Sequence, residues 1–323
     1  MEEILYEEIP SLDLADFNGG NPSKKEKFVS TLGAAYHNIG FVAVKNHSLT
    51  QTMQNQLYTA IKKFFALSDE IKKVYERGDL AGQRGYTGKG KEHAKGRNTG
   101  DLKEFYHVGQ ELTADELAKE GYPPNVWPKE VPEFKEISID VYKALESTGA
   151  SILRAIALYL GLPEYYFDDK IRNGNSILRP IHYFPIEKPE SVPTDAVRAA
   201  EHGDINLITL LMGASADGLQ VLRRDGKWIP ITALPEQLVV NVGDMLERLT
   251  NRKLKSTIHR VVNPPKQLMN VPRYSIPFFM HPRSEMSLAA LMGCVNGENP
   301  KQWEDITAGE FLDQRLREIG LKK

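Results

Sequence analysis

Residues 201–212 read Glu-His-Gly-Asp-Ile-Asn-Leu-Ile-Thr-Leu-Leu-Met, a polar segment followed at once by an apolar run. The apolar part, residues 205–212, is short and rich in branched side chains, which predicts a buried strand. Similar runs recur on both sides of it, and Asp225-Gly226 between two of them is a strong hairpin signal. Many short strands separated by turns predict a sandwich or jelly roll. The predicted strands are 176–184, 205–212, 219–223, 227–231, 237–242, 254–262 and 273–280.

The first half of the chain has helical periodicity instead, so the fold class is mixed α and β. Ser23-Lys24-Lys25-Glu26 has the pattern of a capping box, and helices are predicted from there, from Thr50 and over 132–160. A polar helix over 308–319 ends the chain. No linker separates these parts, so we expect one compact unit with the helical region packed on the jelly roll. Its expected parts are an N-terminal helical region with the first strands (1–175), a jelly-roll core (176–285) and a C-terminal helical segment (286–323).

Composition restricts the class of partner. Hydrophobic residues make up 41% of the 323 residues, the net charge is −2 and the pI is about 6.5. No global basic field indicates nucleic acid or a membrane surface, and no run of 18 apolar residues predicts a membrane span. The acidic N-terminus lacks the features of a signal peptide, and the single Cys294 excludes an internal disulfide. We therefore expect a cytoplasmic protein with a small-molecule substrate, as a monomer or weak homo-oligomer.

Three residues have the character of metal ligands. His202 and Asp204 form a His-X-Asp motif, and His259 follows 55 residues after the aspartate. Two imidazoles and one carboxylate are the ligand set of a non-haem Fe(II) centre, which leaves one face open for substrate and O₂. Alternation along a strand would point His202 and Asp204 to one side and Gly203 away, with His259 expected on a strand across the barrel. A single His-X-Asp is a weak signal, because most such histidines are structural.

A second motif strengthens this interpretation. Arg273 and Ser275 share one face of a predicted strand, where a guanidinium fork and a hydroxyl suit a carboxylate. The alternative is an arginine of the barrel wall paired with an internal acid. Together with the metal motif, the pair predicts an oxygenase that binds an acidic co-substrate beside its metal. His107, His182 and His281 could line the same pocket, but a structural role is the better expectation for each.

A basic, glycine-rich segment runs from Arg84 to Arg97. One interpretation is a mobile flap that closes over an anionic substrate, with Arg84 and Tyr86 touching it. The other is a solvated surface loop, because such loops are common. The segment contains one acid, Glu92, and five basic residues: Arg84, Lys89, Lys91, Lys95 and Arg97.

Several further motifs occur together with these. Residues 9–14 and 40–47 form two short apolar motifs in the first half, and residues 218–221, 241–244 and 256–261 separate the His-X-Asp from Arg273-Tyr274-Ser275. In this order they resemble the isopenicillin N synthase-like branch of the 2-oxoglutarate- and Fe(II)-dependent dioxygenases. The resemblance covers nearly the whole chain.

The resemblance implies a double-stranded β-helix with an N-terminal helical region. It implies that His202, Asp204 and His259 bind Fe(II), and that Arg273 and Ser275 hold the distal carboxylate of 2-oxoglutarate. Tyr183 is the candidate for a further co-substrate contact, although its spacing to Pro185 departs from the family pattern. The implied reaction consumes O₂ and 2-oxoglutarate, releases succinate and CO₂, and hydroxylates a C–H bond of a small, carboxylate-bearing metabolite. Desaturation or ring closure would need only a different substrate pose.

Two alternatives remain open. The first is an Fe(II) oxidase of the same family that does not use 2-oxoglutarate, in which Arg273 and Ser275 bind the substrate's own carboxylate. The second is a non-catalytic jelly-roll protein with a structural metal, although structural sites normally have four protein ligands. One further departure concerns the backbone: the family usually has glycine after the asparagine in Thr250-Asn251-Arg252-Lys253, so Arg252 is expected to adopt a positive φ.

Overall fold

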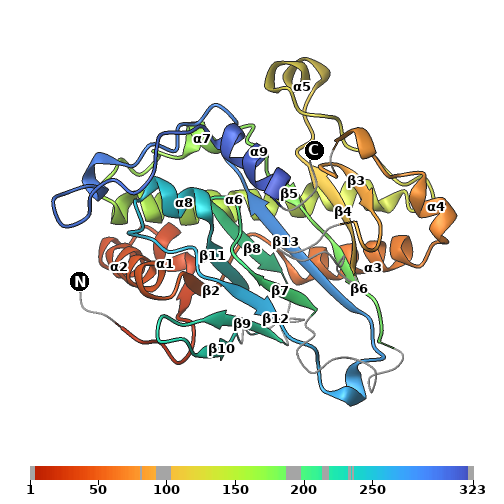
Figure 1. Cartoon of the computed structure of the whole chain (residues 1–323), viewed down its shortest axis with the longest axis horizontal. Helices are drawn as coiled ribbons and strands as arrows, with labels where there is room; N and C mark the ends of the chain where they lie inside the picture. Colours follow the sequence, from red (N-terminus) through yellow and green to blue (C-terminus); the bar gives the residue numbers. More distant parts are fainter. Residues whose placement is uncertain are drawn as a thin grey trace.

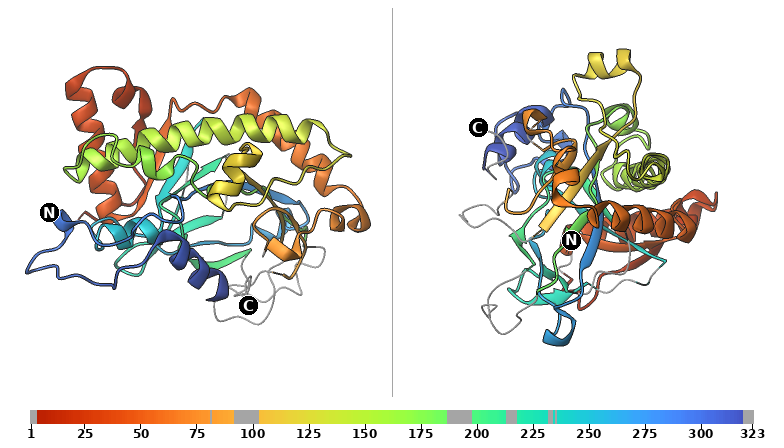
Figure 2. Two further views of the ribbon diagram at one scale, coloured as in Figure 1. Left: turned by 90° about the horizontal axis from the view of Figure 1, so that it is seen from above. Right: turned by 90° about the vertical axis from the view of Figure 1, so that its right-hand side faces the viewer.

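Helices cover one face of a large sheet, and a smaller sheet lies over its other face (Figures 1 and 2). The computed structural model describes residues 4–80, 82–91, 103–186, 198–212, 218–231, 234 and 236–318. Among these residues, no helix is both long and apolar enough to cross a membrane. The predicted jelly roll on a helical region is confirmed.

The large sheet has nine strands and the small sheet has four. The order is β1-β2-β11-β8-β13-β5-β4-β3 in the large sheet, with β6 beside β13 and β4, and β10-β9-β12-β7 in the small one. Only β1 and β2 pair in parallel among the described strands. The strands are β1 (Ser11–Asp13), β2 (Phe41–Lys45), β3 (Gly85–Thr87), β4 (Lys103–Gly109), β5 (Ile177–Leu178), β6 (Ile181–Tyr183), β7 (Ala199–His202), β8 (Ile208–Met212), β9 (Leu219–Leu222), β10 (Trp228–Pro230), β11 (Leu238–Val242), β12 (His259–Val261) and β13 (Arg273–Met280).

The long helix α6 supports the outer face of the large sheet. Its Tyr142 ring meets Phe278 of β13 edge-on at 4.9 Å between ring centroids. A Cβ on its Gly149 would lie 2.4 Å from the sulfur of Met280, so only glycine allows this close approach. The helices are α1 (Leu14–Asn18), α2 (Pro22–Asn38), α3 (Gln51–Phe65), α4 (Asp69–Lys73), α5 (Ala114–Glu120), α6 (Glu133–Tyr159), α7 (Asp168–Ile171), α8 (Asp244–Leu249) and α9 (Ala308–Glu318).

The inner faces of the two sheets enclose a second apolar core. Phe41 and Val239 from the large sheet meet Val221, Ile229 and other buried side chains of the small sheet. Because side chains alternate along a strand, residues of β13 that do not face α6 must face this interior. Phe278 and Met280 face the helices, so Arg273 and Ser275 lie on the inner face.

Several predictions differ from the structure. The expected strand 176–184 is divided into β5 and β6. The expected strand 254–262 is only His259–Val261, because the preceding residues form a loop after α8. The expected capping box at Ser23 is wrong: Asn21 is the N-cap and accepts from the Lys24 amide, with Pro22 in the first turn. Neither β4 nor β7 was predicted. The side chains of β4 are buried on both faces, so this strand lacks a two-residue alternation.

The loop after α8 contains the predicted positive φ. Asn251 has φ 47° and Arg252 has φ 68°. The Asn251 amide donates to the Arg248 carbonyl and the Arg252 amide to the Glu247 carbonyl, which is a Schellman ending with Asn251 as its left-handed residue. Asparagine is common at the left-handed position that ends a helix. A second left-handed residue directly after it, here Arg252, is strained unless that residue is glycine.

Replacing Arg252 by glycine is therefore expected to give a more stable protein than replacing it by alanine. The difference should be about 1 kcal/mol, since alanine keeps a Cβ in the left-handed region and glycine does not. Urea unfolding of the two variants measures it. Equal midpoints for both variants would contradict a strained backbone at this position.

Candidate functional site

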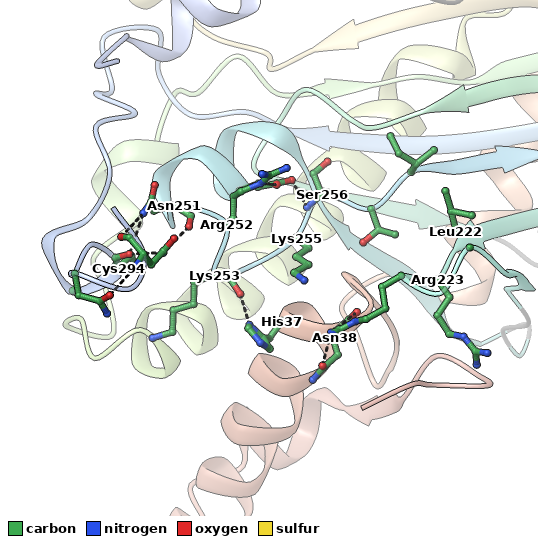
Figure 3. A pocket seen from close by; sticks show the side chains of 18 residues that line it. His37, Asn38, Leu222, Arg223, Asn251, Arg252, Lys253, Lys255, Ser256 and Cys294 are labelled. Carbon is green, nitrogen blue, oxygen red and sulfur yellow. Dashed lines mark hydrogen bonds and ion pairs between the residues drawn. The ribbon is translucent and has the colours of Figure 1, made fainter. Parts of the chain in front are cut away.

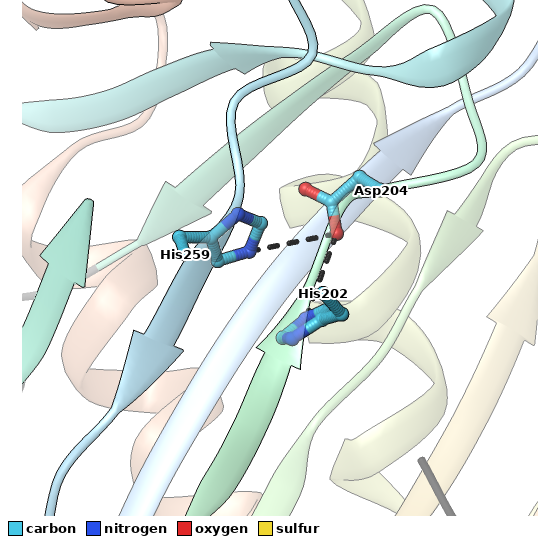
Figure 4. A group of neighbouring side chains, drawn as sticks. All are labelled: His202, Asp204 and His259. Carbon is cyan, nitrogen blue, oxygen red and sulfur yellow. Dashed lines mark ion pairs between the residues drawn. The ribbon is translucent and has the colours of Figure 1, made fainter. Parts of the chain in front are cut away.

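His202 and His259 lie directly opposite each other on neighbouring antiparallel strands (Figure 4). His202 ends β7 and His259 begins β12, both in the small sheet. The expectation that His259 would come from across the barrel is therefore wrong. Adjacent pairing places the two ring centroids 4.4 Å apart.

Asp204 completes the group from the turn after β7. Its Oδ1 lies 4.0 Å from His202 Nε2 and 3.8 Å from His259 Nε2. Among the described residues, this is the one cluster of at least three potential ligands within 4.8 Å of one another. The other oxygen, Oδ2, accepts hydrogen bonds from Thr209 Oγ1 at 2.6 Å and Asn241 Nδ2 at 2.7 Å. These two bonds leave Oδ1 directed at the imidazoles.

Backbone carbonyls orient both rings. His202 Nδ1 is 2.7 Å from the Ala200 carbonyl, and His259 Nδ1 is 3.2 Å from the Thr257 carbonyl. A nitrogen that faces a carbonyl must carry the hydrogen, so each Nε2 keeps its lone pair. Two imidazole lone pairs and one carboxylate oxygen therefore converge, which is the donor set that suits Fe(II).

The protonation states also suit a metal. Burial lowers the pKa of His202 to about 4, aided by the neighbouring His259 and opposed by Asp204. Burial by itself would raise the pKa of Asp204, but the two histidines and the bonds from Asn241 and Thr209 outweigh it and lower that pKa. Near neutral pH the group thus presents a neutral His202 and an ionised Asp204.

Gly203, between His202 and Asp204, lies close to the side chains of Asp244 and Ser256. A Cβ there would lie 3.0 Å from Asp244 Oδ1 and 3.1 Å from Ser256 Oγ. Asp244 is held in turn by Arg315 of α9, at 3.2 Å between Oδ2 and Nη2. The middle residue of the motif is therefore small for a packing reason.

Arg273, Ser275 and Tyr183 meet on the inner face of the large sheet. Arg273 is paired in register with Tyr183, and Ser275 with Ile181. The Arg273 guanidinium lies 5.1 Å from the centroid of the Tyr183 ring. All three side chains are buried, so the structure brings together the residues predicted to hold a carboxylate.

More cations border the same inner face. Lys103 pairs in register with Tyr183, and its charge contributes to the lowered pKa of His202. Burial, together with the neighbouring Arg273, lowers the pKa of Arg198. Arg179 lies 3.7 Å from the centroid of Phe105. These three cations were missed in the sequence because they come from three separate segments.

A buried polar network lies on the opposite face of the same strands. Glu104 is fully buried and accepts from Lys72 Nζ at 2.8 Å and from Tyr86 Oη at 2.5 Å. His182 Nδ1 lies 2.7 Å from its other oxygen, and the His182 ring stacks on Tyr274 at 4.8 Å. Tyr274 follows Arg273 directly, so the network supports the strand that presents the arginine. No sequence pattern indicated this network.

The structure corrects the expected role of Arg84 and Tyr86. Arg84 is fully buried against Gly109, its Nη1 donates to the Gln83 carbonyl, and burial lowers its pKa to about 10. Tyr86 is 5% exposed and donates to Glu104 on the helix side of the sheet. Tyr86 therefore faces away from the inner face that carries Arg273, and Arg84 is packed against Gly109. Within the segment, Lys91 is paired with Glu76 at 2.6 Å, and residues 92–97 lie outside the described residues.

The remaining candidate histidines are not part of the metal group. His107 Nδ1 contacts the Gly82 carbonyl, His182 belongs to the Glu104 network, and His281 is buried with its pKa lowered to about 4 by that burial. These contacts and this burial are consistent with the structural role expected for the three histidines. Cys294 is a free, buried thiol, as expected.

Comparison with known proteins gives matches over both halves of the chain. Residues 9–130 match the family described as non-haem dioxygenase in morphine synthesis N-terminal, and residues 174–282 match the 2OG-Fe(II) oxygenase superfamily. A 2-oxoglutarate-Fe(II) type oxidoreductase from Emericella nidulans is 32% identical over 97% of this chain and 92% of its own. A proline hydroxylase from Petromyces alliaceus is 34% identical over 96% of this chain and 98% of its own.

Solved structures agree with these matches. A 2OG-Fe(II) oxygenase family protein from Caulobacter crescentus is 46% identical, with a TM-score of 0.86 over 96% of this chain and 99% of its own. A full-length Neurospora crassa protein, solved in complex with alpha-KG and thymine, is 31% identical, with a TM-score of 0.85 over 96% of each chain.

Proposed function

Because the chain belongs to the 2OG-Fe(II) oxygenase superfamily, we propose that it hydroxylates an unactivated C–H bond of a small, carboxylate-bearing metabolite. Enzymes of this superfamily use Fe(II) and 2-oxoglutarate. The balanced reaction consumes one O₂, one 2-oxoglutarate and one substrate, and yields succinate, CO₂ and the alcohol. One oxygen atom enters the product and the other enters succinate.

His202 Nε2, His259 Nε2 and Asp204 Oδ1 would hold the metal. Fe(II) bound there supplies the redox chemistry that couples O₂ reduction to decarboxylation of the co-substrate. The chain's own contribution is orientation. Thr209 and Asn241 hold Asp204 in one rotamer, and the carbonyls of Ala200 and Thr257 fix both imidazole tautomers.

Arg273 and Ser275 would bind the distal carboxylate of 2-oxoglutarate. The guanidinium fork gives two parallel donors, and the hydroxyl gives a third on the same face of β13. Tyr183 would fix the guanidinium plane from the neighbouring strand. Burial of these groups strengthens each charged bond, because little water competes for the donors.

Positive charge near the metal group supports the proposal of an acidic substrate. Arg273 accounts for one carboxylate of the co-substrate, while Lys103 and Arg198 add positive charge beside His202 and Arg273. Such a surface concentrates anions near the metal. The proline hydroxylase among the relatives is consistent with a small amino acid as substrate, whereas the thymine bound to the Neurospora crassa protein represents the uncharged class.

A succinate assay tests the proposal. The Fe(II)-loaded enzyme would be incubated with O₂, with and without 2-oxoglutarate, against amino acids and other small carboxylic acids. Their amides, which lack the carboxylate, and thymine, which is uncharged, serve as controls. We expect stimulated succinate formation with an acid and not with its amide, and no product without 2-oxoglutarate. Stimulation only by compounds that lack a carboxylate would refute the carboxylate preference, and product without 2-oxoglutarate would favour the co-substrate-independent oxidase.

Arg273→Ala is expected to raise the 2-oxoglutarate KM at least tenfold, because a charge-assisted contact contributes about 1.5–3 kcal/mol. Arg273→Lys should recover only part of the loss, since an ammonium does not form the bidentate fork. Steady-state kinetics in 2-oxoglutarate measures both, and Arg77→Ala, which removes an exposed arginine, is the control. An unchanged KM would assign Arg273 to the substrate's own carboxylate.

A further inference from the structure

We propose that His182 is a positioning residue for the co-substrate. Stacked on Tyr274, it fixes the spacing of β6 and β13, whose opposite face presents Tyr183 and Arg273. The proposal rests on the assignment of Arg273 to 2-oxoglutarate. It gives a role in co-substrate binding to two side chains that lie on the other face of the sheet from that arginine.

The register of β6 and β13 places the two pairs next to each other (Figure 1). Tyr183 of β6 is paired with Arg273 of β13, and the next pair along the two strands is His182 with Tyr274. Because side chains alternate along a strand, the first pair lies on the inner face and the second on the outer face. Any movement of one strand against the other would therefore displace both pairs together.

Aromatic packing holds the outer pair. The rings of His182 and Tyr274 are stacked, with centroids 4.8 Å apart and planes within 13°. Phe65 of α3 covers the stack, at 5.4 Å from His182 and 6.3 Å from Tyr274 between ring centroids. His182 is buried. Cross-strand aromatic pairs of this kind stabilise one spacing of the two strands.

A hydrogen bond fixes the imidazole within its plane. His182 Nδ1 lies 2.7 Å from Glu104 Oε1, and a carboxylate oxygen only accepts, so this nitrogen carries the hydrogen. The other oxygen of Glu104 accepts from Lys72 and Tyr86, which leaves the carboxylate little freedom to turn. Glu104 belongs to β4 and is paired in register with His182, so three neighbouring strands are joined through one ring.

The inner pair is sensitive to this spacing. The Arg273 guanidinium lies 5.1 Å from the centroid of the Tyr183 ring. A guanidinium forms two parallel bonds to a carboxylate only when its plane and position are correct, and small misplacements lower affinity. The histidine ligands belong to β7 and β12 of the other sheet. Loosening the stack should therefore weaken 2-oxoglutarate binding and leave iron binding unchanged.

Calorimetric titration of the Fe(II)-loaded full chain with 2-oxoglutarate, in the absence of O₂, tests the proposal. Tyr274→Leu removes one ring of the stack, and His182→Leu removes the other ring together with the bond to Glu104. Each should weaken 2-oxoglutarate binding by about 3–30-fold, the range for a residue that acts through a packed network. Tyr274→Phe keeps the ring and should retain the affinity. In the succinate assay the 2-oxoglutarate KM should rise more than kcat falls, with full iron content.

Two control variants separate positioning from general loosening and from binding elsewhere. Tyr142→Leu removes a ring that meets Phe278 on the same face of β13, farther from Arg273, and should lower the Tm without changing 2-oxoglutarate affinity. Lys255→Gln alters a separate pocket with several basic side chains (Figure 3), to which a dianion could also bind, and should change nothing.

Three results would overturn the proposal: unchanged 2-oxoglutarate affinity in both leucine variants of the stack, an equal loss in Tyr142→Leu, or a parallel loss of iron. Thermal melts of each variant identify misfolding, and Tyr274→Leu keeps the test decisive if His182→Leu does not fold. Arg273→Ala, titrated alongside, tests the underlying assignment separately. Unchanged affinity in that variant would refute the assignment of Arg273 itself, whereas a loss in Arg273→Ala alone would refute only the role of His182.

Discussion

Alanine at His202, Asp204 or His259 is expected to abolish succinate formation and to strip most of the iron, while the fold is retained. Each change removes one of three donors that the structure brings within 4.8 Å of one another. Loss of a partner of a metal ligand typically lowers affinity or activity by about 10–100-fold, and loss of the ligand itself should exceed that range. Iron content after desalting and coupled succinate formation measure the two effects.

Two further variants provide an intermediate case and a control for iron binding. Thr209→Val removes one of the two bonds to Asp204 Oδ2 and should weaken iron binding by about 10–100-fold without abolishing it. His47→Ala removes a histidine that contacts the Glu236 carbonyl and should leave iron stoichiometry unchanged. Normal iron occupancy and turnover in any of the three ligand variants would show that the metal is bound elsewhere.

Lys72→Met is expected to lower the free energy of unfolding by about 3–5 kcal/mol, because it removes one partner of a buried ion pair. Lys72 is 3% exposed and Glu104 is fully buried. Without the ammonium, the partners left to the Glu104 charge among the described residues are His182 and the Tyr86 hydroxyl. Denaturant unfolding measures the loss.

A double variant separates charge from packing. Lys72→Met with Glu104→Gln removes both charges and should lose less stability than Lys72→Met alone. Lys63→Met breaks the exposed pair with Glu133 and should lose about 0–1 kcal/mol. A loss of that small size in Lys72→Met would show that the buried pair does not stabilise the fold.

The pH dependence of the Lys72 effect follows from the two pKa shifts. Burial would raise the pKa of Glu104, but hydrogen bonds from His182, Lys72 and Tyr86 outweigh it and lower that pKa. Its contribution is therefore full above the unfolded value of about 4.3 and is lost as pH falls through the folded pKa. For Lys72, burial opposes but the bonds to Glu104 and Asp69 raise the pKa. That contribution is full below about 10.4 and is lost at higher pH.

Much of the fold could be predicted because its signals are local. A strand was predicted over residues 273–280, with Arg273 and Ser275 on one face, and the structure has β13 over those residues. The helix predicted over 132–160 is Glu133–Tyr159. The family pattern also predicted the positive φ at Arg252, since a backbone conformation depends on few neighbours. Where a side chain made a non-local contact the prediction failed, as with Arg84, whose glycine- and lysine-rich surroundings indicated a surface loop.

The sequence by itself determined the types of donor and their order along the chain, because ligand chemistry depends on residue identity and spacing. It did not predict β7, which ends at His202, or the turn that carries Asp204. Only the tertiary structure decided that β12 lies beside β7, so that His259 faces His202. It also decided that Thr209 and Asn241 turn Asp204 toward the imidazoles. These contacts join residues far apart in the chain, and their pairing is set by how the sheets and helices pack, which no local pattern records.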